Sequence, residues 1–391
     1  MKHVKLFEAF STHKPLTKRQ INWLDKCTTG NWSLNPSTGL VDVDGDFDCI
    51  SQRLKDFKGV AFGHVKGDFS CNDNLLTSLA GAPQTVDGDF CCSSNQLTSL
   101  VDGPQIVGGG FSCSSNQLTS LVDAPQTVGG YFGCSFNQLT SLKGAPQTVG
   151  ESFNCSSNQL TSLVDAPQTV GGNFDCGNNQ LTSLDGAPKT VNGYFSCSNN
   201  RLTSLVGFPQ TVKGDFYCRY NHLTSLERAP QTVGGVFYCD SNQLTSLEGA
   251  PKTVGGDFNC ADNPLKSLEG APERVGSFNI SIWNSDPAIR TLDWDKGWDK
   301  GDKEFTKTLT SKLKKINALG SGADKGKSVS MLLSLMKESE ILKYLLSNNL
   351  STSDKFEVYG AIKTNMPDVW NKLKDELDPE GATSDLLDLG F

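Results

Sequence analysis

A unit of 21 residues recurs along most of this chain and restricts the folds open to it more than any other feature. The first regular copy starts with Gly67-Asp68-Phe69-Ser70-Cys71 and continues through Asn74 and Leu79 to Pro83. Phenylalanine lies two residues before the cysteine of each copy, and asparagine lies three residues after it. The cysteines that mark the copies are Cys71, Cys92, Cys113, Cys134, Cys155, Cys176, Cys197, Cys218, Cys239 and Cys260. Because so short a unit cannot bury its own apolar side, the copies are expected to stack into a solenoid with one continuous core.

Within each copy, Phe and Cys alternate with polar residues, and this alternation predicts a short strand with one buried face. A glycine before the strand favours a tight bend with positive φ, although Glu151 takes that place in one copy. The glycines concerned are Gly88, Gly109, Gly130 and Gly172. The proline excludes a long helix on the return path, which we expect to be extended or a single 3₁₀ turn. Counting the degenerate copies at Phe47 and Phe278, twelve strands predict a solenoid about 50 to 60 Å long.

The asparagine of each copy has a predicted structural role. A buried amide can donate to and accept from the backbone of its own and adjacent turns. We therefore expect an asparagine ladder from Asn74 to Asn263 that stabilises the stack.

The unit V-x-G-x-F-x-C-x-x-N-x-L-x-x-L-x-x-x-P resembles the leucine-rich repeat, L-x-x-L-x-L-x-x-N-x-L, with Phe and Cys at two strand positions. The phrase Asn95-Gln96-Leu97-Thr98-Ser99-Leu100 resembles the short, proline-containing repeats of secreted bacterial effectors. The opening phrase, Leu24 to Thr28 and Gly39 to Gly45, joined to these repeats, looks like leucine-rich-repeat proteins encoded by large tailed phages. The resemblance implies a β-solenoid-like leucine-rich-repeat fold with a parallel sheet on its concave face. The resemblance says little about function, because members of the family share an architecture and not an activity.

The sequence predicts three parts. Residues 1–44 are expected to form an N-terminal cap with a helix around Leu16 to Leu24, starting at Thr17 or Thr12. Residues 45–283 form the solenoid, and residues 284–391 are predicted to be a C-terminal α-helical domain with an acidic tail.

Composition limits the partners and the compartment. The net charge of −8 argues against a general nucleic-acid binder. No segment approaches the roughly 20 apolar residues that span a bilayer, and the start of the chain lacks the apolar core of a signal peptide. Thirteen cysteines, most in one repeated position, have no unique disulfide pairing, so we predict buried free thiols, with Cys91 alone pointing outward. These features favour a reducing cytoplasm, that of the host if the chain is phage-encoded, with the virion as the alternative.

No catalytic grouping emerges from the sequence. Residues Gly322 to Ser328 resemble a phosphate-binding loop, but Ser321 stands where the motif needs glycine and no strand precedes it, so a linker between helices is the alternative. The histidines show no metal-ligand or triad spacing; they are His3, His13, His64 and His222. Some leucine-rich-repeat effectors carry a ubiquitin-ligase domain with a catalytic cysteine, yet the last cysteine here, Cys260, lies within the repeats. We therefore expect a protein that is not an enzyme and needs no cofactor or metal.

The candidate site consists of large or charged residues on the outward strand face, where most other repeats have small polar residues. Neighbouring repeats bring them within about 5 to 10 Å of one another, and tyrosine and arginine are enriched at interface hot spots. The predicted partner-binding residues are Tyr194, Asp215, Tyr217, Arg219, Tyr220, Tyr238 and Asp240, with an Arg219–Asp240 ion pair beside the rings. Tyr131 and Phe136 are a smaller second candidate. Neutral variation, or stacking that only stabilises the sheet, is the alternative interpretation.

These residues favour a non-catalytic scaffold that binds a protein through its concave face, a host protein if the chain is phage-encoded. The alternative is a virion or cell-surface component that binds a receptor or glycan. The oligomeric state is left open.

Overall fold

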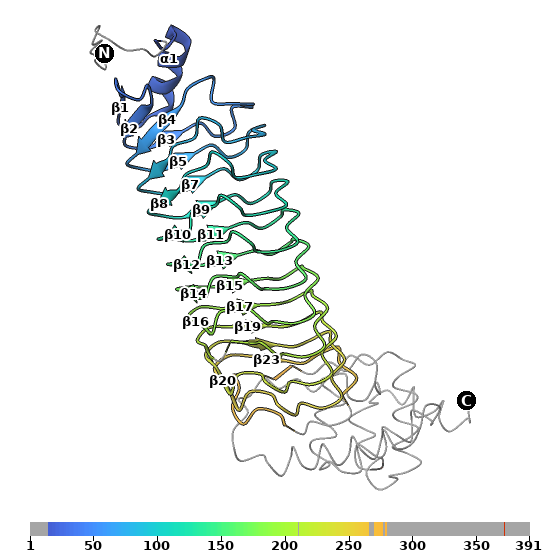
Figure 1. Cartoon of the computed structure of the whole chain (residues 1–391). Coiled ribbons are helices and arrows are strands. Elements are labelled where there is room, and N and C mark those ends of the chain that lie inside the picture. The colour runs from blue at the N-terminus through green and yellow to red at the C-terminus, as the bar shows by residue number, and fades with distance from the viewer. Residues whose placement is uncertain (1–14, 210, 266–269, 277, 280–370, 372–391) are drawn as a thin grey trace.

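The computed structural model describes residues 15–209, 211–265, 270–276, 278–279 and 371. Over this part the chain winds in successive turns stacked along one axis (Figure 1). The predicted C-terminal helical domain, the acidic tail and the segment Gly322 to Ser328 lie outside the described residues, as do residues 1–14 of the predicted N-terminal cap.

Two 12-stranded sheets follow the stack from end to end. Most turns contain two short strands. The first has two residues and ends at the repeat's valine, and the second starts at the phenylalanine after a three-residue bend, as from Val86 to Phe90. The Phe-Cys sheet contains, in spatial order, β3 (Phe47–Asp48), β5 (Phe69–Ser70), β7 (Phe90–Cys91), β9 (Phe111–Ser112), β11 (Phe132–Gly133), β13 (Phe153–Asn154), β15 (Phe174–Asp175), β17 (Phe195–Ser196), β19 (Phe216–Tyr217), β21 (Phe237–Tyr238), β23 (Phe258–Asn259) and β24 (Phe278–Asn279). The Thr-Val sheet contains β1 (Asn31–Leu34), β2 (Val41–Asp44), β4 (Phe62–Val65), β6 (Thr85–Val86), β8 (Ile106–Val107), β10 (Thr127–Val128), β12 (Thr148–Val149), β14 (Thr169–Val170), β16 (Thr190–Val191), β18 (Thr211–Val212), β20 (Thr232–Val233) and β22 (Thr253–Val254).

The Phe-Cys sheet confirms the predicted strand of each repeat and its parallel pairing. The Thr-Val sheet was not predicted, although its strands lie on the return path that we expected to be extended.

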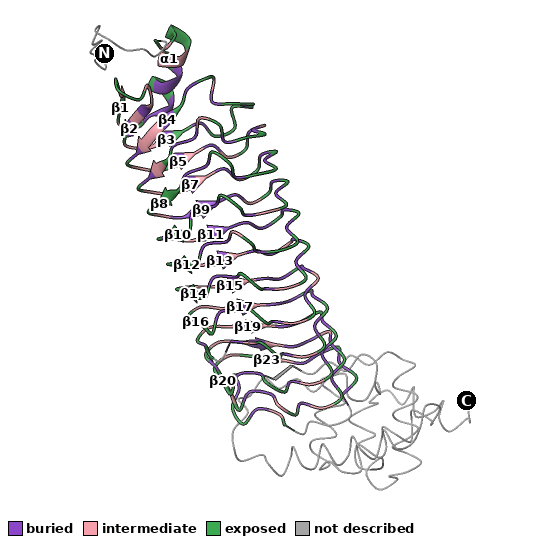
Figure 2. Ribbon diagram, viewed as in Figure 1, coloured by how far each residue is buried: buried purple, intermediate pink, exposed green. Residues whose placement is uncertain are grey.

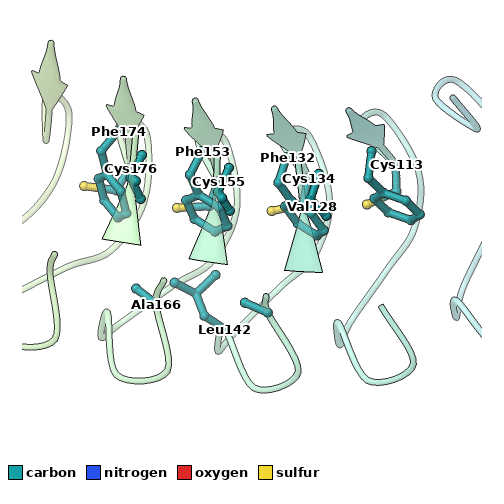
Figure 3. Packing of buried hydrophobic residues seen from close by; sticks show 14 of the residues in the cluster. Cys113, Val128, Phe132, Cys134, Leu142, Phe153, Cys155, Ala166, Phe174 and Cys176 are labelled. Atoms are coloured by element: carbon teal, nitrogen blue, oxygen red, sulfur yellow. The ribbon is translucent and has the colours of Figure 1, made fainter. Parts of the chain in front are cut away.

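The register places each residue beside its equivalent in the next turn. Phe132 pairs with Phe111 on one side and with Phe153 on the other. The rings of these neighbours are stacked with centroids 5.3 and 5.6 Å apart. The phenylalanine and cysteine columns are buried, and most turns add two buried leucines and a buried valine (Figures 2 and 3). The regular turns thus contribute the same apolar set to one continuous core, as the repeat predicts.

The asparagine ladder is present. In the middle of the stack, Asn158 donates from Nδ2 to the carbonyl oxygens of Cys134 and Cys155, at 3.0 and 3.1 Å. Its Oδ1 accepts a hydrogen bond from the Leu139 backbone N–H at 3.0 Å, so one amide links two turns. The same pattern recurs from Asn74 to Asn263, and these side chains are buried.

The predicted positive φ at the glycine before each Phe-Cys strand is wrong. Gly88 is not among the positive-φ residues, and neither are Gly109, Gly130 and Gly172. Close approach of the backbone explains the preference for glycine instead, because a Cβ on Gly88 would lie 2.8 Å from the carbonyl carbon of Gly67 in the preceding turn.

At the N-terminal end, helix α1 (Lys18–Cys27) forms where the apolar spacing predicts it, with Thr17 as its N-cap. The Gln20 backbone N–H donates to Thr17 Oγ1 at 3.3 Å, and the Thr17 N–H donates to Gln20 Oε1 at 2.8 Å, which is a capping box. The Trp23 ring packs edge-on against Phe47 at 5.3 Å, so the helix covers the first ring of the phenylalanine column. Strand β1 pairs antiparallel with β2 and occupies the first edge of the Thr-Val sheet.

Candidate functional site

Three tyrosine rings lie in series on the outer surface of the Phe-Cys sheet. Tyr194 immediately precedes β17, and Tyr217 and Tyr238 pair in register as the last residues of β19 and β21. The ring centroids of Tyr194 and Tyr217 are 6.1 Å apart, and those of Tyr217 and Tyr238 are 5.6 Å apart. Both pairs meet edge to face, at interplanar angles of 68° and 76°. The side-by-side arrangement predicted for Tyr217 and Tyr238 is therefore confirmed. We call the three tyrosines, together with Asp215, Arg219, Tyr220 and Asp240, the tyrosine face.

Asp215 holds this face in place. Its Oδ2 accepts a hydrogen bond from the Tyr217 phenol at 2.9 Å, and its Oδ1 accepts one from the Val236 backbone N–H of the next turn, also at 2.9 Å. Burial, followed by the bond to Asp215 and its charge, raises the pKa of Tyr217 to about 12. Asp215 thus orients a ring and joins two turns, a positioning role that the sequence did not reveal.

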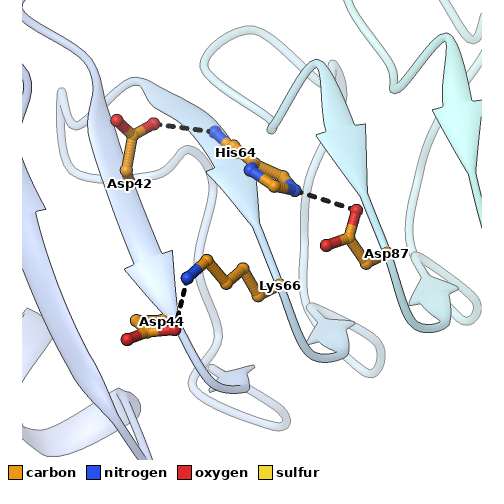
Figure 4. Close-up of polar contacts among 5 residues, drawn as sticks. All are labelled: Asp42, Asp44, His64, Lys66 and Asp87. Carbon is orange, nitrogen blue, oxygen red and sulfur yellow. Dashed lines mark hydrogen bonds and ion pairs between the residues drawn. The ribbon is translucent and has the colours of Figure 1, made fainter.

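The predicted Arg219–Asp240 ion pair is wrong. Among the described residues, the ion pairs are His64–Asp87 and Lys66–Asp44, both on the Thr-Val sheet (Figure 4). Asp240 is 7% exposed and accepts a hydrogen bond from Asn259 Nδ2 at 3.2 Å. The Arg219 guanidinium lies over the Tyr220 ring instead, 5.9 Å from its centroid. Burial raises the pKa of Asp240, and the charge of Arg219 lowers it only in part.

Tyr220 owes its exposure to an unusual backbone position. The residue before each ladder asparagine has a φ between 53° and 56° throughout the regular turns. Most turns place Ser, Asp or Asn there, but two place an aromatic residue: Phe136 and Tyr220, which are 63% and 52% exposed. Left-handed φ is uncommon for bulky residues, so both aromatics are held in a strained conformation that points them into solvent. The sequence alone did not indicate this column.

Two further outward residues of the Phe-Cys sheet, which the sequence did not indicate, lie near the tyrosine face. Asp175, two turns before Tyr217 in the same column, is half-buried, and burial raises its pKa. Burial, followed by the charge of Asp175, raises the pKa of Tyr194. Ser198 follows Cys197 on the outward side and is 8% exposed, and its Oγ has no hydrogen-bond partner among the residues that the structure describes. A buried hydroxyl without a partner is uncommon.

The second candidate, Tyr131 and Phe136, does not form one aromatic group, since no ring contact joins them within the described residues. Tyr131 lies over Gly110, where a Cβ would come within 3.1 Å of the ring carbon Cγ. Burial raises the pKa of Tyr131 to about 12.

The cysteine column offers little reactivity. Twelve of the thirteen thiols are buried, and Cys91 is partly exposed as predicted. Burial raises the pKa of the column thiols, for example Cys155 and Cys176, which disfavours the thiolate. Within the part of the chain that the structure describes, no three His, Cys, Asp or Glu side chains gather in a way that could hold a metal ion.

His64 and His222 have structural surroundings. His64 links the turns on either side of it in the Thr-Val sheet. Its backbone N–H donates a hydrogen bond to Asp42 Oδ1, and its Nε2 lies 2.9 Å from Asp87 Oδ1 (Figure 4). His222 is exposed in the column of Gln96, with Nδ1 3.3 Å from Gln243 Nε2. His3 and His13 lie outside the described residues.

No protein-family model matches the chain, and no curated protein sequence matches it. Among solved structures it is similar to YopM from Yersinia enterocolitica WA-314, with 18% identity over 70% of this chain and 62% of that chain, at a TM-score of 0.47. It is also similar to YopM from Yersinia pestis, described as a leucine-rich effector protein, with 20% identity over 55% of this chain and 65% of that chain, at a TM-score of 0.41. The chain thus spans less than two thirds of either protein. The assignment of a parallel β-solenoid rests on the register of the chain's own strands, in which Phe132 pairs with Phe153 one 21-residue turn later. Within the described residues, no helix has the length and apolar character needed to cross a bilayer.

Proposed function

We propose that the protein is a non-catalytic scaffold that binds a partner protein on the tyrosine face. The observation that carries the proposal is the unbroken series of three partly exposed rings, Tyr194, Tyr217 and Tyr238, on consecutive turns of one sheet. Rigid aromatic side chains supply large contact area at low conformational cost, and tyrosine is enriched at interface hot spots.

The preceding turns provide a contrast on the same sheet. There the outward residues are mostly serine and glycine, and the serines bond one another: the Ser93 and Ser112 hydroxyls are 2.6 Å apart, and those of Ser114 and Ser135 are 3.1 Å apart. Small side chains that satisfy one another present little surface for a partner to bury. The side chains of the tyrosine face therefore differ from those of the preceding turns in both size and polarity.

The resemblance to tailed-phage proteins adds a finer proposal, in which the partner is a host protein met in the host cytoplasm. A virion component that binds a receptor or glycan is the competing proposal. Mass spectrometry of purified particles distinguishes the two, because only a virion component is recovered with the particles.

The test compares binding by the full-length chain and by the double variant Tyr217→Ala with Tyr238→Ala. The bait is immobilised, and partners are captured from the native cells or from infected cells and identified by mass spectrometry. Affinities are then measured with the purified partner. We expect the double variant to weaken binding by about 2 kcal/mol or more.

The control is Ser112→Ala with Ser156→Ala, which truncates two outward side chains in earlier turns of the same sheet and removes no aromatic ring. Circular dichroism and the thermal midpoint check that both variants keep the fold. Equal affinities for the Tyr217/Tyr238 variant and the control would rule out the tyrosine face as the docking site.

A further inference from the structure

We infer that the partner presents a lysine- or arginine-rich segment to the tyrosine face. The inference rests on the proposed function and names the chemistry of the partner. It is carried by the charges of this face, by the geometry of its rings, and by the contact that its one guanidinium makes.

The first argument is charge complementarity. From β15 to β23, the outward positions of the Phe-Cys sheet, with the positive-φ position that follows them, hold five carboxylates and one guanidinium. The carboxylates belong to Asp175, Asp215, Asp240, Asp257 and Asp262, and the guanidinium belongs to Arg219. Within the described residues none of the five takes part in an ion pair. Five carboxylates against one guanidinium give this surface a net negative charge, which attracts a cationic partner and repels an acidic peptide or a nucleic acid.

The second argument concerns the rings. A tyrosine ring has a negative face, over which a lysine or arginine side chain is attracted. Because successive rings are turned by 68° and 76°, the series offers ring faces in more than one direction. The hydrogen bond from the Tyr217 phenol to the Asp215 carboxylate adds electron density to the central ring.

The third argument is a contact already present. Arg219 lies over the Tyr220 ring at 5.9 Å, so this surface accommodates a guanidinium on a tyrosine. The φ of 55° points the Tyr220 ring into solvent, and the ring is 52% exposed, so a cation from a partner can reach it. The carboxylates around the rings can then accept hydrogen bonds from the same cationic side chains.

The experiment uses the full-length chain and two fluorescein-labelled peptides, one of alternating arginine and glycine and one with glutamate in place of arginine. Binding is followed by fluorescence anisotropy at low and at physiological ionic strength. We expect the arginine peptide to bind, more weakly as salt is added, and the glutamate peptide not to bind. Tyr217→Ala with Tyr238→Ala should weaken binding of the arginine peptide about tenfold, whereas Tyr217→Phe with Tyr238→Phe, which keeps both rings, should change it by less than about threefold.

Two results would overturn the inference. One is failure of the arginine peptide to bind. The other concerns the variant Asp257→Asn with Asp262→Asn, which removes two exposed carboxylates. If this variant weakens binding of the arginine peptide and the Tyr217→Ala, Tyr238→Ala variant does not, the peptide is attracted by charge alone. If the inference fails while the captured partner still needs Tyr217 and Tyr238, the proposed function stands with a different partner chemistry. If capture is also insensitive to both rings, the proposed function falls as well.

Discussion

The phenol of Tyr217 donates a hydrogen bond to the carboxylate of Asp215, two residues earlier, at 2.9 Å. Together with burial, this bond raises the pKa of Tyr217 from 10.0 to about 12, because ionisation would place a phenolate beside a carboxylate. We predict that titration followed by phenolate absorbance shows a late-ionising group that Tyr217→Phe removes. Asp215→Asn should shift that group toward lower pH.

Tyr131, whose pKa burial also raises to about 12, is the internal reference for this titration. It lies four turns from Tyr217, so Tyr131→Phe should remove a second late-ionising group and leave the effect of Asp215→Asn intact. A titration in which Asp215→Asn leaves the alkaline end of the curve unchanged would show that the bond does not control Tyr217.

Asn158 links two turns through hydrogen bonds to buried backbone groups. Replacing it by alanine leaves the Leu139 N–H and the Cys134 carbonyl without these partners, which should lower the free energy of unfolding by about 1 to 3 kcal/mol. The control is Gln159→Ala, because Gln159 is the exposed neighbour of Asn158. Equal urea midpoints for the two variants would contradict the structural role of the ladder.

Repetition makes some features of this fold predictable. The alternation of Phe and Cys identifies the buried side of the Phe-Cys strand, and the identical copies fix its register. Once the register is known, Tyr217 and Tyr238 must be neighbours, and the asparagines must form a column. These predictions needed only the period and the strand geometry.

Other features depend on information that the period does not contain. A Thr-Val strand of two residues is too short to show an alternation, so the second sheet left no clear pattern. Serine, the commonest residue at the positive-φ position, does not signal that backbone conformation, and the strain shows only where Phe136 and Tyr220 occupy it. The period also does not show that Arg219 lies over Tyr220, or that Asp240 accepts a hydrogen bond from Asn259 instead of pairing with Arg219.

Because of the buried cysteine thiols, the free energy of unfolding is expected to fall as the pH rises into the alkaline range. Burial raises the pKa of these thiols above the ordinary value of 9.0, as at Cys176 and Cys218, so the folded state keeps protons that the unfolded state loses. This stabilisation is fully present below about pH 9 and is lost as the pH rises further. We predict that the urea midpoint falls above pH 9, and that Cys176→Ala reduces this pH dependence although it lowers the midpoint at neutral pH.

Accessibility of the thiols gives an independent check. A thiol reagent should modify Cys91 rapidly in the folded protein, and Cys91→Ser should abolish the fast phase, because the other cysteines are buried. Denaturation should release nearly all thirteen groups of the chain. Rapid modification of several column thiols in the folded state would contradict the burial of the column.

Phe136 combines a φ of 53° with 63% exposure, so its backbone is strained while its ring gains little from burial. Glycine adopts this φ without a Cβ penalty, and relief of the strain, about 1 to 2 kcal/mol, is partly offset by the greater freedom of glycine in the unfolded chain. We predict that Phe136→Gly raises the free energy of unfolding by up to about 1 kcal/mol, as measured by urea denaturation. Gln138→Gly, at an exposed position of the same turn without positive φ, should lower it by about 0.5 to 1 kcal/mol. If Phe136→Gly lowers the urea midpoint as much as the control does, the ring stabilises the fold itself. If it raises the midpoint, the ring occupies a costly position with no benefit to stability, which is what a surface kept for a partner requires.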